Sequence, residues 1–245
     1  VSGNGMTDAM VINTIGNAML VDGLILAGKI QQGRVCWVGS EVSRSVLAFT
    51  GLLPDYCGDF QENDIEWAIT ENYNGPCSCC PIRRQMGDYK NAKIVGHMHF
   101  LNLAKENPHM HITSVSPGAV GGSFAGGAHC PVKQLMACCP CMFRCLCVTH
   151  ACSPSVSTRI GAQRYVDAMT GEPPKWPTGS MLMSPKTGGL CLWGAWGQMV
   201  DNRPFAPYFL DEELCKKASI KVREWATKWT QQAAPGQVTM IRGVA

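Results

Sequence analysis

Several features that would assign the 245-residue chain to a protein class at once are missing. No run of about 20 uninterrupted apolar residues occurs, so the sequence predicts no transmembrane helix. There is no signal-peptide pattern, and the first residue is Val1 rather than Met, which suggests that the chain begins after something cut, processed or not recorded. Charged residues make up only 16%, the net charge is +3, and no basic run is interleaved with aromatic residues. Nucleic acid is therefore not an expected partner.

Cysteine is the residue in excess, with 14 copies, most of them gathered at 77–80 and 138–152. A chain of this length that is 46% hydrophobic can bury a substantial core and does not need a disulfide scaffold. We therefore expect free, buried thiols that act as small hydrophobic side chains. Within 138–152 only Cys138 and Cys141 have the C-x-x-C interval, and no second pair matches it. A substrate lid or an interaction surface is favoured there over a metal or iron–sulfur site.

Two H-x-H pairs also raise the question of a metal site. Residues two apart on a helix point to different faces, which disfavours His97 with His99. His109 and His111 would share a face of a strand, but no third ligand is evident. The sequence predicts no metal.

Helical and strand-like segments alternate along the first half of the chain. Apolar residues recur at helical spacing over 6–32, where Thr7 is a plausible N-cap, and again over 89–107. Each segment is followed by a strand-like run that ends in small residues, at 34–40 and at 109–120. This alternation predicts an α/β domain with a parallel sheet, whose functional residues lie beyond the carboxyl ends of the strands.

The second half contains two further predicted helices. One covers 153–171, and the other is an amphipathic helix over 209–229 with Asp211 as its N-cap. A shorter helical piece is expected around 63–73, within an otherwise irregular stretch. We expect one partial domain over the whole chain, made of a catalytic-motif half at 1–127, a Cys/Met-rich lid at 128–171, and a C-terminal strand, helix and tail at 172–245.

The stretch DYKNAK (88–93) places Tyr89 and Lys93 four residues apart, on one face of a helix. An ammonium beside a phenol favours the phenolate, so we expect Lys93 to lower the pKa of Tyr89 from about 10 toward neutrality. Ser40 ends the preceding strand, so it can meet Tyr89 at one edge of the sheet and hold a substrate carbonyl. These three side chains are suited to carbonyl–alcohol interconversion.

Four motifs in register resemble the back half of a short-chain dehydrogenase/reductase. They are INTIG (12–16) as the N-x-x-G element, RVCWVGS (34–40) as the serine strand, YKNAK (89–93) as the Y-x-x-x-K element, and SVSPGAV (114–120) as the following P-G strand. The long interval from Ser40 to Tyr89 is similar to that of the light-dependent protochlorophyllide oxidoreductase and retinol dehydrogenase branches. The resemblance covers about 6–230 and implies a Rossmann-type parallel sheet with flanking helices.

The resemblance also implies a catalytic tetrad, which falls on Asn13, Ser40, Tyr89 and Lys93. Tyr89 would be the general acid/base, and Lys93 would lower its pKa and contact the nicotinamide ribose. Ser40 would orient the carbonyl oxygen, and Asn13 would hold a water molecule in the proton relay.

The cofactor implied by the related branches is NADP(H), and the substrate is a small apolar carbonyl, alkene or alcohol compound with a ring or polyene character. The cofactor-binding positions carried over from the family are Tyr89, Lys93, Pro117, Gly118 and Val120.

The phosphate cradle of the family is what the chain lacks. No T-G-x-x-x-G-x-G precedes Asn13, the SGNG stretch (2–5) is a poor substitute, and GGSFAGG (121–127) follows the P-G strand instead of preceding the first helix. We therefore expect a fold that is N-terminally truncated relative to the family. The chain is either the C-terminal part of a longer enzyme, which would bind NADP(H), or a non-catalytic subunit of a larger plastid or mitochondrial membrane complex, without cofactor.

A truncated parallel sheet has an open edge strand. We expect a protein partner to cover that edge and the apolar residues 128–152. Peripheral membrane contact is a further expectation, and the related branches favour a plastid or another organelle as the compartment.

Overall fold

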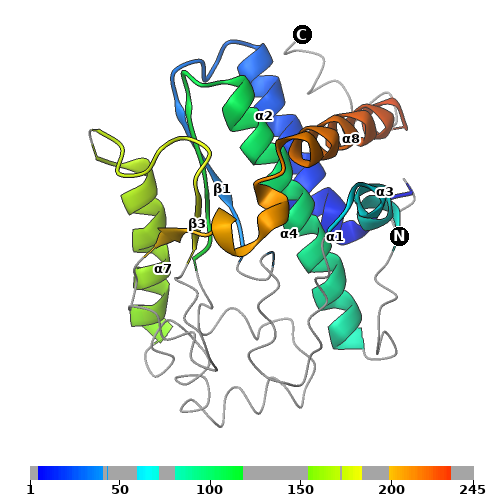
Figure 1. Cartoon of the computed structure of the whole chain (residues 1–245), viewed down its shortest axis with the longest axis horizontal. Coiled ribbons are helices and arrows are strands. Elements are labelled where there is room, and N and C mark those ends of the chain that lie inside the picture. The colour runs from blue at the N-terminus through cyan, green and yellow to red at the C-terminus, as the bar shows by residue number, and fades with distance from the viewer. Residues whose placement is uncertain are drawn as a thin grey trace.

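The structure is a computed structural model that describes residues 5–40, 43, 60–71, 81–117, 154–171, 173–183 and 199–232. Its framework is a sheet of four strands in the order β1-β2-β3-β4, flanked by helices (Figure 1). The strands are β1 (Arg34–Val38), β2 (His111–Val115), β3 (Met181–Met183) and β4 (Val200–Asp201).

The sheet is mixed. β1 pairs with β2, and β2 with β3, in parallel, whereas β4 is antiparallel to β3. The predicted α/β class is confirmed, but the expectation of a wholly parallel sheet is wrong at β4. A short antiparallel edge strand on a parallel sheet is a common arrangement, and two residues carry no periodicity from which a sequence could reveal it.

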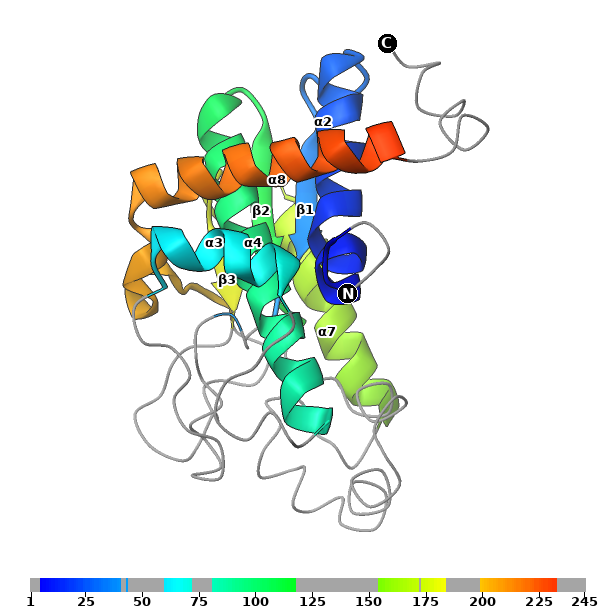
Figure 2. The same cartoon turned by 90° about the vertical axis from the view of Figure 1, so that its right-hand side faces the viewer.

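Helices cover both faces of this sheet, as Figure 1 shows. One face carries α7 (Pro154–Met169), and the opposite face carries α2 (Gly16–Leu26) and α4 (Pro81–Glu106). Outside α4 lie α3 (Glu62–Thr70) and α8 (Glu212–Gln232), and α8 runs across both α2 and α4 (Figure 2). Two 3-10 turns precede α8, namely η4 (Arg203–Phe205) and η5 (Pro207–Phe209).

The core has a part on each side of the sheet. Between the sheet and α4 it is built from Trp37, Phe100, Leu103, Met110 and Ile112. On the α7 side it is built from Val115, Ala168, Leu182 and Met199. Because successive strand residues point to opposite faces, the polar residues of β1 and β2 are also divided between the two sides. This division decides which of them lie near α4.

The first helical segment is continuous from α1 (Asp8–Met10) through a π-helical turn, η1 (Val11–Ile15), into α2. Thr7 is its N-cap, as predicted, and its hydroxyl accepts a hydrogen bond from the Met10 backbone N–H at 3.2 Å. A π-helical turn inside a helix often marks a functional site. Here the turn contains Asn13.

The same segment bears on the membrane question. Asp8–Leu26 has a mean hydropathy of 1.6 and is long and apolar enough, by length and composition alone, to span a membrane. The prediction of no such helix rested only on uninterrupted apolar runs. That prediction is wrong for this segment by the criteria of length and composition. Of the 18-residue apolar window, 22% is buried within the described structure. Both the core helix of a soluble protein and a signal sequence pass the same test.

Helix α4 begins at Pro81, eight residues before Tyr89, so the expectation of a helix that starts near Tyr89 is wrong. Proline suits the first turn of a helix because its missing N–H would have no intrahelical partner there. Tyr89 therefore lies well inside the helix, where its backbone is fixed by regular helical hydrogen bonds.

Helix α8 is the predicted C-terminal amphipathic helix. Asp211 caps it as predicted, since Asp211 Oδ1 accepts from the Leu214 N–H at 2.9 Å. Farther along, Arg223 donates to Asp22 of α2 at 2.9 and 3.2 Å and to Glu106 of α4 at 2.8 Å. One side chain thus ties three helices together.

Two described cysteines, Cys36 and Cys215, are free thiols, as expected. Burial raises the pKa of each to about 12, so both are inert at neutral pH. In the described part of the chain, no three His, Cys, Asp or Glu side chains gather as a metal site would require. Residues 118–153 lie outside the described residues, and with them Gly118, Val120, GGSFAGG and the Cys-rich segment.

Candidate active site

Tyr89 and Ser40 meet at the carboxyl end of β1. Ser40 lies two residues beyond Val38, the last residue of β1, and Tyr89 projects from the middle of α4. Their side chains are hydrogen bonded, and both residues are half-buried. The hydroxyl groups that the sequence predicted to meet are therefore in contact, at the end of the sheet where α/β proteins place their functional residues.

Lys93 lies one helical turn beyond Tyr89 on the same face of α4, and only 5% of it is exposed. Its Nζ donates to the Val38 carbonyl oxygen at 2.8 Å. The same nitrogen lies 4.8 Å from the centroid of the Trp37 ring and 5.4 Å from that of the Tyr89 ring. The ammonium thus anchors the end of β1 and faces the Tyr89 ring.

Burial, and not the charge of Lys93, has the largest effect on the pKa of Tyr89. Burial raises the pKa of Tyr89 above its usual value, and the Ser40 hydrogen bond opposes this only in part. The expectation that Lys93 lowers this pKa toward neutrality is wrong for the present arrangement, because the ammonium is directed at the Val38 carbonyl. Tyr89 is a protonated phenol at neutral pH, which suits a proton donor.

Lys93 itself has a pKa that burial lowers to about 8. At neutral pH the ammonium still predominates, but its proton is held less tightly than that of a solvated lysine. Lys93 can therefore give up a proton near physiological pH.

Asn13 is on the neighbouring helix and outside this group. Its Nδ2 donates to the Ala9 carbonyl at 3.0 Å, and no hydrogen bond of its side chain within the described residues reaches Tyr89, Ser40 or Lys93. The next residue makes the connection instead, because Thr14 Oγ1 donates to the carbonyl of Ala92, beside Lys93, at 2.6 Å. The structure thus brings together three of the four predicted tetrad residues and packs the fourth one helix away.

Pro117 is the one described residue of the predicted P-G turn. It follows β2 by two residues and is half-buried, at the same end of the sheet as Ser40. The preceding Ser116 is buried, and its carbonyl accepts from Arg164 of α7 at 3.1 Å. The end of β2 is therefore fixed from the side opposite α4.

Sequence reasoning missed two polar residues beneath this group, His97 and Ser114. His97 lies eight residues beyond Tyr89 on the same face of α4, and its Nδ1 is 2.8 Å from Ser114 Oγ of β2. The signal was the i, i+4, i+8 spacing of Tyr89, Lys93 and His97, but His97 was considered only as a metal ligand. As predicted for an H-x-H pair on a helix, His99 faces elsewhere, with its Nδ1 3.0 Å from Ser219 Oγ of α8.

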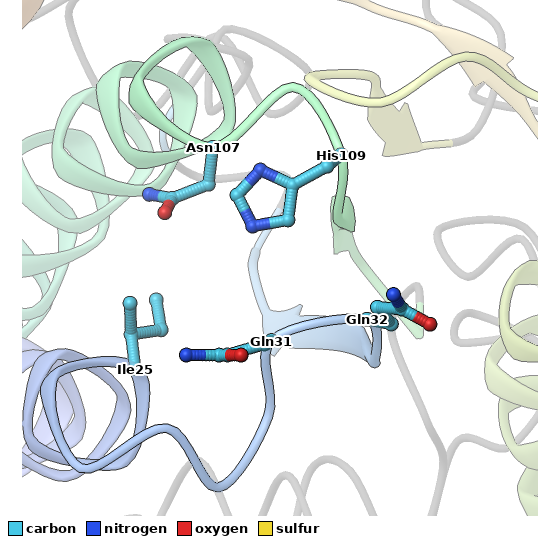
Figure 3. Close-up of a pocket in the computed structure, with 5 residues that line it drawn as sticks. All are labelled: Ile25, Gln31, Gln32, Asn107 and His109. Carbon is cyan, nitrogen blue, oxygen red and sulfur yellow. The ribbon is translucent and has the colours of Figure 1, made fainter.

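An open cavity of about 510 Å³ lies at the other end of the sheet, near the amino ends of β1 and β2 (Figure 3). It is lined by Ile25, Gln31, Gln32, Asn107 and His109. None of these residues belongs to the Tyr89 group, and the chemistry suggested by Tyr89, Lys93 and Ser40 is located elsewhere. The cavity is not the candidate substrate site.

Comparisons of the chain with family models, with curated proteins and with solved structures find no match. What the candidate site can do is therefore argued from its geometry and its motifs.

Proposed function

We propose that the chain is an NADP(H)-dependent oxidoreductase of the short-chain dehydrogenase/reductase type, with a truncated Rossmann-type sheet. Its substrate would be an apolar carbonyl, alkene or alcohol compound. The observation that carries the proposal is the hydrogen bond between Tyr89 and Ser40, with Lys93 one turn below, at the carboxyl end of a parallel strand. Separate regions of the sequence supply these groups, and their proximity supports a shared role at one substrate atom.

In the reduction of a carbonyl, Ser40 and Tyr89 would act on the same oxygen. Both hydroxyl groups can donate to it, which holds the carbonyl in place and stabilises the negative charge that develops on it. The Tyr89 proton then passes to that oxygen. Because burial favours the protonated phenol, Tyr89 is poised as the donor. Lys93, whose pKa is about 8, can return the proton.

Lys93 would hold part of the proposed cofactor. Its ammonium donates one of its three N–H groups to the Val38 carbonyl, which leaves two donors for ribose hydroxyls. NADPH would supply the hydride. Among the described residues, no glycine-rich turn leads into a helix at this end of the sheet, so the pyrophosphate would have to be bound by groups outside them.

A second candidate function is that of a non-catalytic subunit in a larger membrane complex of an organelle. One observation favours it. Among the described strands β1 pairs only with β2, so no described strand covers its other edge, and Val38 at its end is 52% exposed. Helix α2 exposes 62% of Leu20 and 87% of Leu26. A partner chain would cover these surfaces, or α2 would contact a membrane surface.

Binding of NADPH tests the proposal. We expect the full chain to quench NADPH or tryptophan fluorescence on binding and to oxidise NADPH with apolar aldehydes or ketones. Lys93→Met should weaken NADPH binding at least tenfold. Lys105→Met, at the exposed end of the same helix, is the matched control and should leave it unchanged. No NADPH binding by the full chain, or equal binding by the two variants, would support the subunit alternative instead.

A further inference from the structure

His97 is the only titratable side chain of α4 that lies fully buried on the same face as Tyr89 and Lys93, within the described residues. It follows Lys93 by one helical turn. Its ring contacts Trp37 edge-on at 4.7 Å between centroids and Phe209 at 5.4 Å. Packing from β1 and η5 therefore fixes the ring plane.

A hydrogen bond fixes the ring's rotation. His97 Nδ1 and Ser114 Oγ are 2.8 Å apart, and Ser114 is paired with Trp37 in the register of β1 and β2. The Ser114 backbone N–H is bonded to the Ser180 carbonyl at 3.0 Å, so Ser114 cannot shift independently of the sheet. The imidazole is thus held from β2, the second strand of the sheet.

The held ring lies directly against the turn that carries Ser40. A Cβ atom at Gly39 would be 2.6 Å from His97 Cε1, 2.9 Å from Nε2 and 2.8 Å from Ser114 Oγ. Only glycine allows this approach, since real Cβ contacts are longer. The Gly39 N–H is bonded to Val115 of β2 at 2.8 Å, so the turn is pressed between the ring and β2.

His97 carries no charge in this position. Burial first, and the nearby Lys93 charge second, hold the pKa of His97 well below its usual value, while the Ser40 backbone opposes them. Nε2 faces the Gly39–Ser40 turn, because a Cβ atom at Gly39 would lie 2.9 Å from it. Nε2 is buried and has no hydrogen bond of normal geometry to a described residue. The consistent tautomer has Nδ1 accepting from the Ser114 hydroxyl and the proton on Nε2.

The Ser40 carbonyl is held by the residues that follow it. It accepts from Ser43 Oγ at 2.7 Å, and the Ser43 carbonyl accepts in turn from the Tyr208 hydroxyl of η5. The turn is therefore held at Ser40 by Ser43 and packed at Gly39 against the His97 ring.

We propose that His97 is a positioning residue, whose neutral Nε2–H imidazole supports the Gly39–Ser40 turn at the place where Ser40 Oγ meets the Tyr89 hydroxyl. Its effect on turnover rests on the proposed function, whereas its effect on the contact between Ser40 and Tyr89 does not. A core histidine with only a packing role would tolerate any side chain of similar size.

Two amide variants separate these roles, because each retains a polar atom near one ring nitrogen. Glutamine places its terminal amide near Nε2, and asparagine places its amide near Nδ1. We expect His97→Asn to lower kcat for NADPH oxidation about tenfold to a hundredfold with little change in KM, as a misplaced catalytic group does. His97→Gln should recover most of that loss. Equal kcat values for the two variants, at equal unfolding free energies, would overturn the proposal.

Nuclear magnetic resonance tests the same proposal without turnover. In the wild-type chain, which has 6 histidines, ¹⁵N shifts should show His97 as the neutral Nε2–H tautomer at pH 7. The ¹³Cζ signal of Tyr89 should titrate at higher pH in His97→Asn than in wild type or His97→Gln, because the Ser40 hydrogen bond is lost.

If His97→Asn does not fold, Ser114→Ala replaces it, since it removes the Nδ1 partner and should raise the Tyr89 titration in the same direction. An imidazolium, an Nδ1–H tautomer, or a Tyr89 titration unaffected by these changes would refute the positioning role. If the chain neither binds nor oxidises NADPH but the Tyr89 titration moves as expected, the proposed function fails and the role of His97 stands.

Discussion

At the scale of single residues, the candidate site illustrates how burial can outweigh a neighbouring charge. The distance along the helix from Tyr89 to Lys93 suits charge stabilisation of a phenolate, yet the ammonium is bonded to Val38 and the phenol is desolvated. Tyr89 therefore keeps its proton at neutral pH. A group with these properties gives up a proton only to a strong acceptor, such as a developing alkoxide.

Gly39 gives a residue-scale prediction. Gly39→Ala should lower the free energy of unfolding by about 1–3 kcal/mol, because the new methyl group has to displace the His97 ring or the turn. Denaturant unfolding measures this.

The control is Gly23→Ala in α2, where a Cβ meets nothing within 4 Å. There the substitution should stabilise the protein by about 0.5–1 kcal/mol, since alanine is the better helix former. A Gly39→Ala variant as stable as Gly23→Ala would contradict the close approach of His97.

At the scale of elements, α4 links the sheet to the outer helices, and its two buried histidines face opposite ways. His99 lies against α8, with Ser219 Oγ at 3.0 Å and Asp22 Oδ2 at 3.9 Å from its ring nitrogens. Burial lowers the pKa of His99 to about 4, although the Asp22 carboxylate partly opposes this. Helix α8 thus packs on a neutral imidazole.

The lowered pKa of His99 predicts how the stability of the protein depends on pH. Between pH 4 and about 6.5 the unfolded chain binds a proton at His99 that the folded chain does not, so stability is full above pH 6.5 and is lost as the pH falls toward 4. The loss from this group should reach about 3 kcal/mol. Urea unfolding at several pH values measures it.

His99→Gln should flatten the dependence of stability on pH. The control is His109→Gln, at an exposed position in the turn before β2, which should leave that dependence as in wild type. His97 contributes in the same direction, so some slope should remain in His99→Gln. A stability that rises as the pH falls below 6.5 would contradict the buried, neutral state of both rings.

The elements also show which features a sequence can predict. A β-branched and aromatic run located β1, and helical periodicity located α8 and the face shared by Tyr89 and Lys93. The capping residues Thr7 and Asp211 were recognisable because caps act locally. The start of α4, the antiparallel β4 and the π-helical turn around Asn13 were not recognisable. These depend on packing between distant segments, and so does the contact of His97 with Gly39 and Ser114.

At the scale of the whole molecule, several large apolar side chains of the described structure are exposed. Ile12 of η1 is 72% exposed and Leu26 of α2 is 87% exposed, while Val38 at the end of β1 is 52% exposed. An exposed apolar surface of this kind marks an interaction site or an aggregation risk. Both proposed functions require something to cover it, whether further chain or a partner.

Charged substitutions on this surface should separate association from stability. Leu20→Lys together with Leu26→Lys should change the unfolding free energy by no more than about 0.5 kcal/mol, since both side chains are exposed. The same variant should reduce self-association of the purified chain in sedimentation velocity. Ile15→Lys, at a fully buried position of η1, should instead unfold the protein. Unchanged self-association of the double variant would show that this surface does not mediate association.

The turnover of Tyr89→Phe is the most direct test of the central claim that Tyr89 donates the proton. NADPH oxidation by the full chain with an apolar aldehyde would be compared in wild type, in Tyr89→Phe and in Tyr165→Phe, a half-buried tyrosine of α7. We predict that Tyr89→Phe lowers kcat at least a hundredfold with NADPH binding retained, and that Tyr165→Phe does not. Wild-type turnover that persists in Tyr89→Phe would contradict the account.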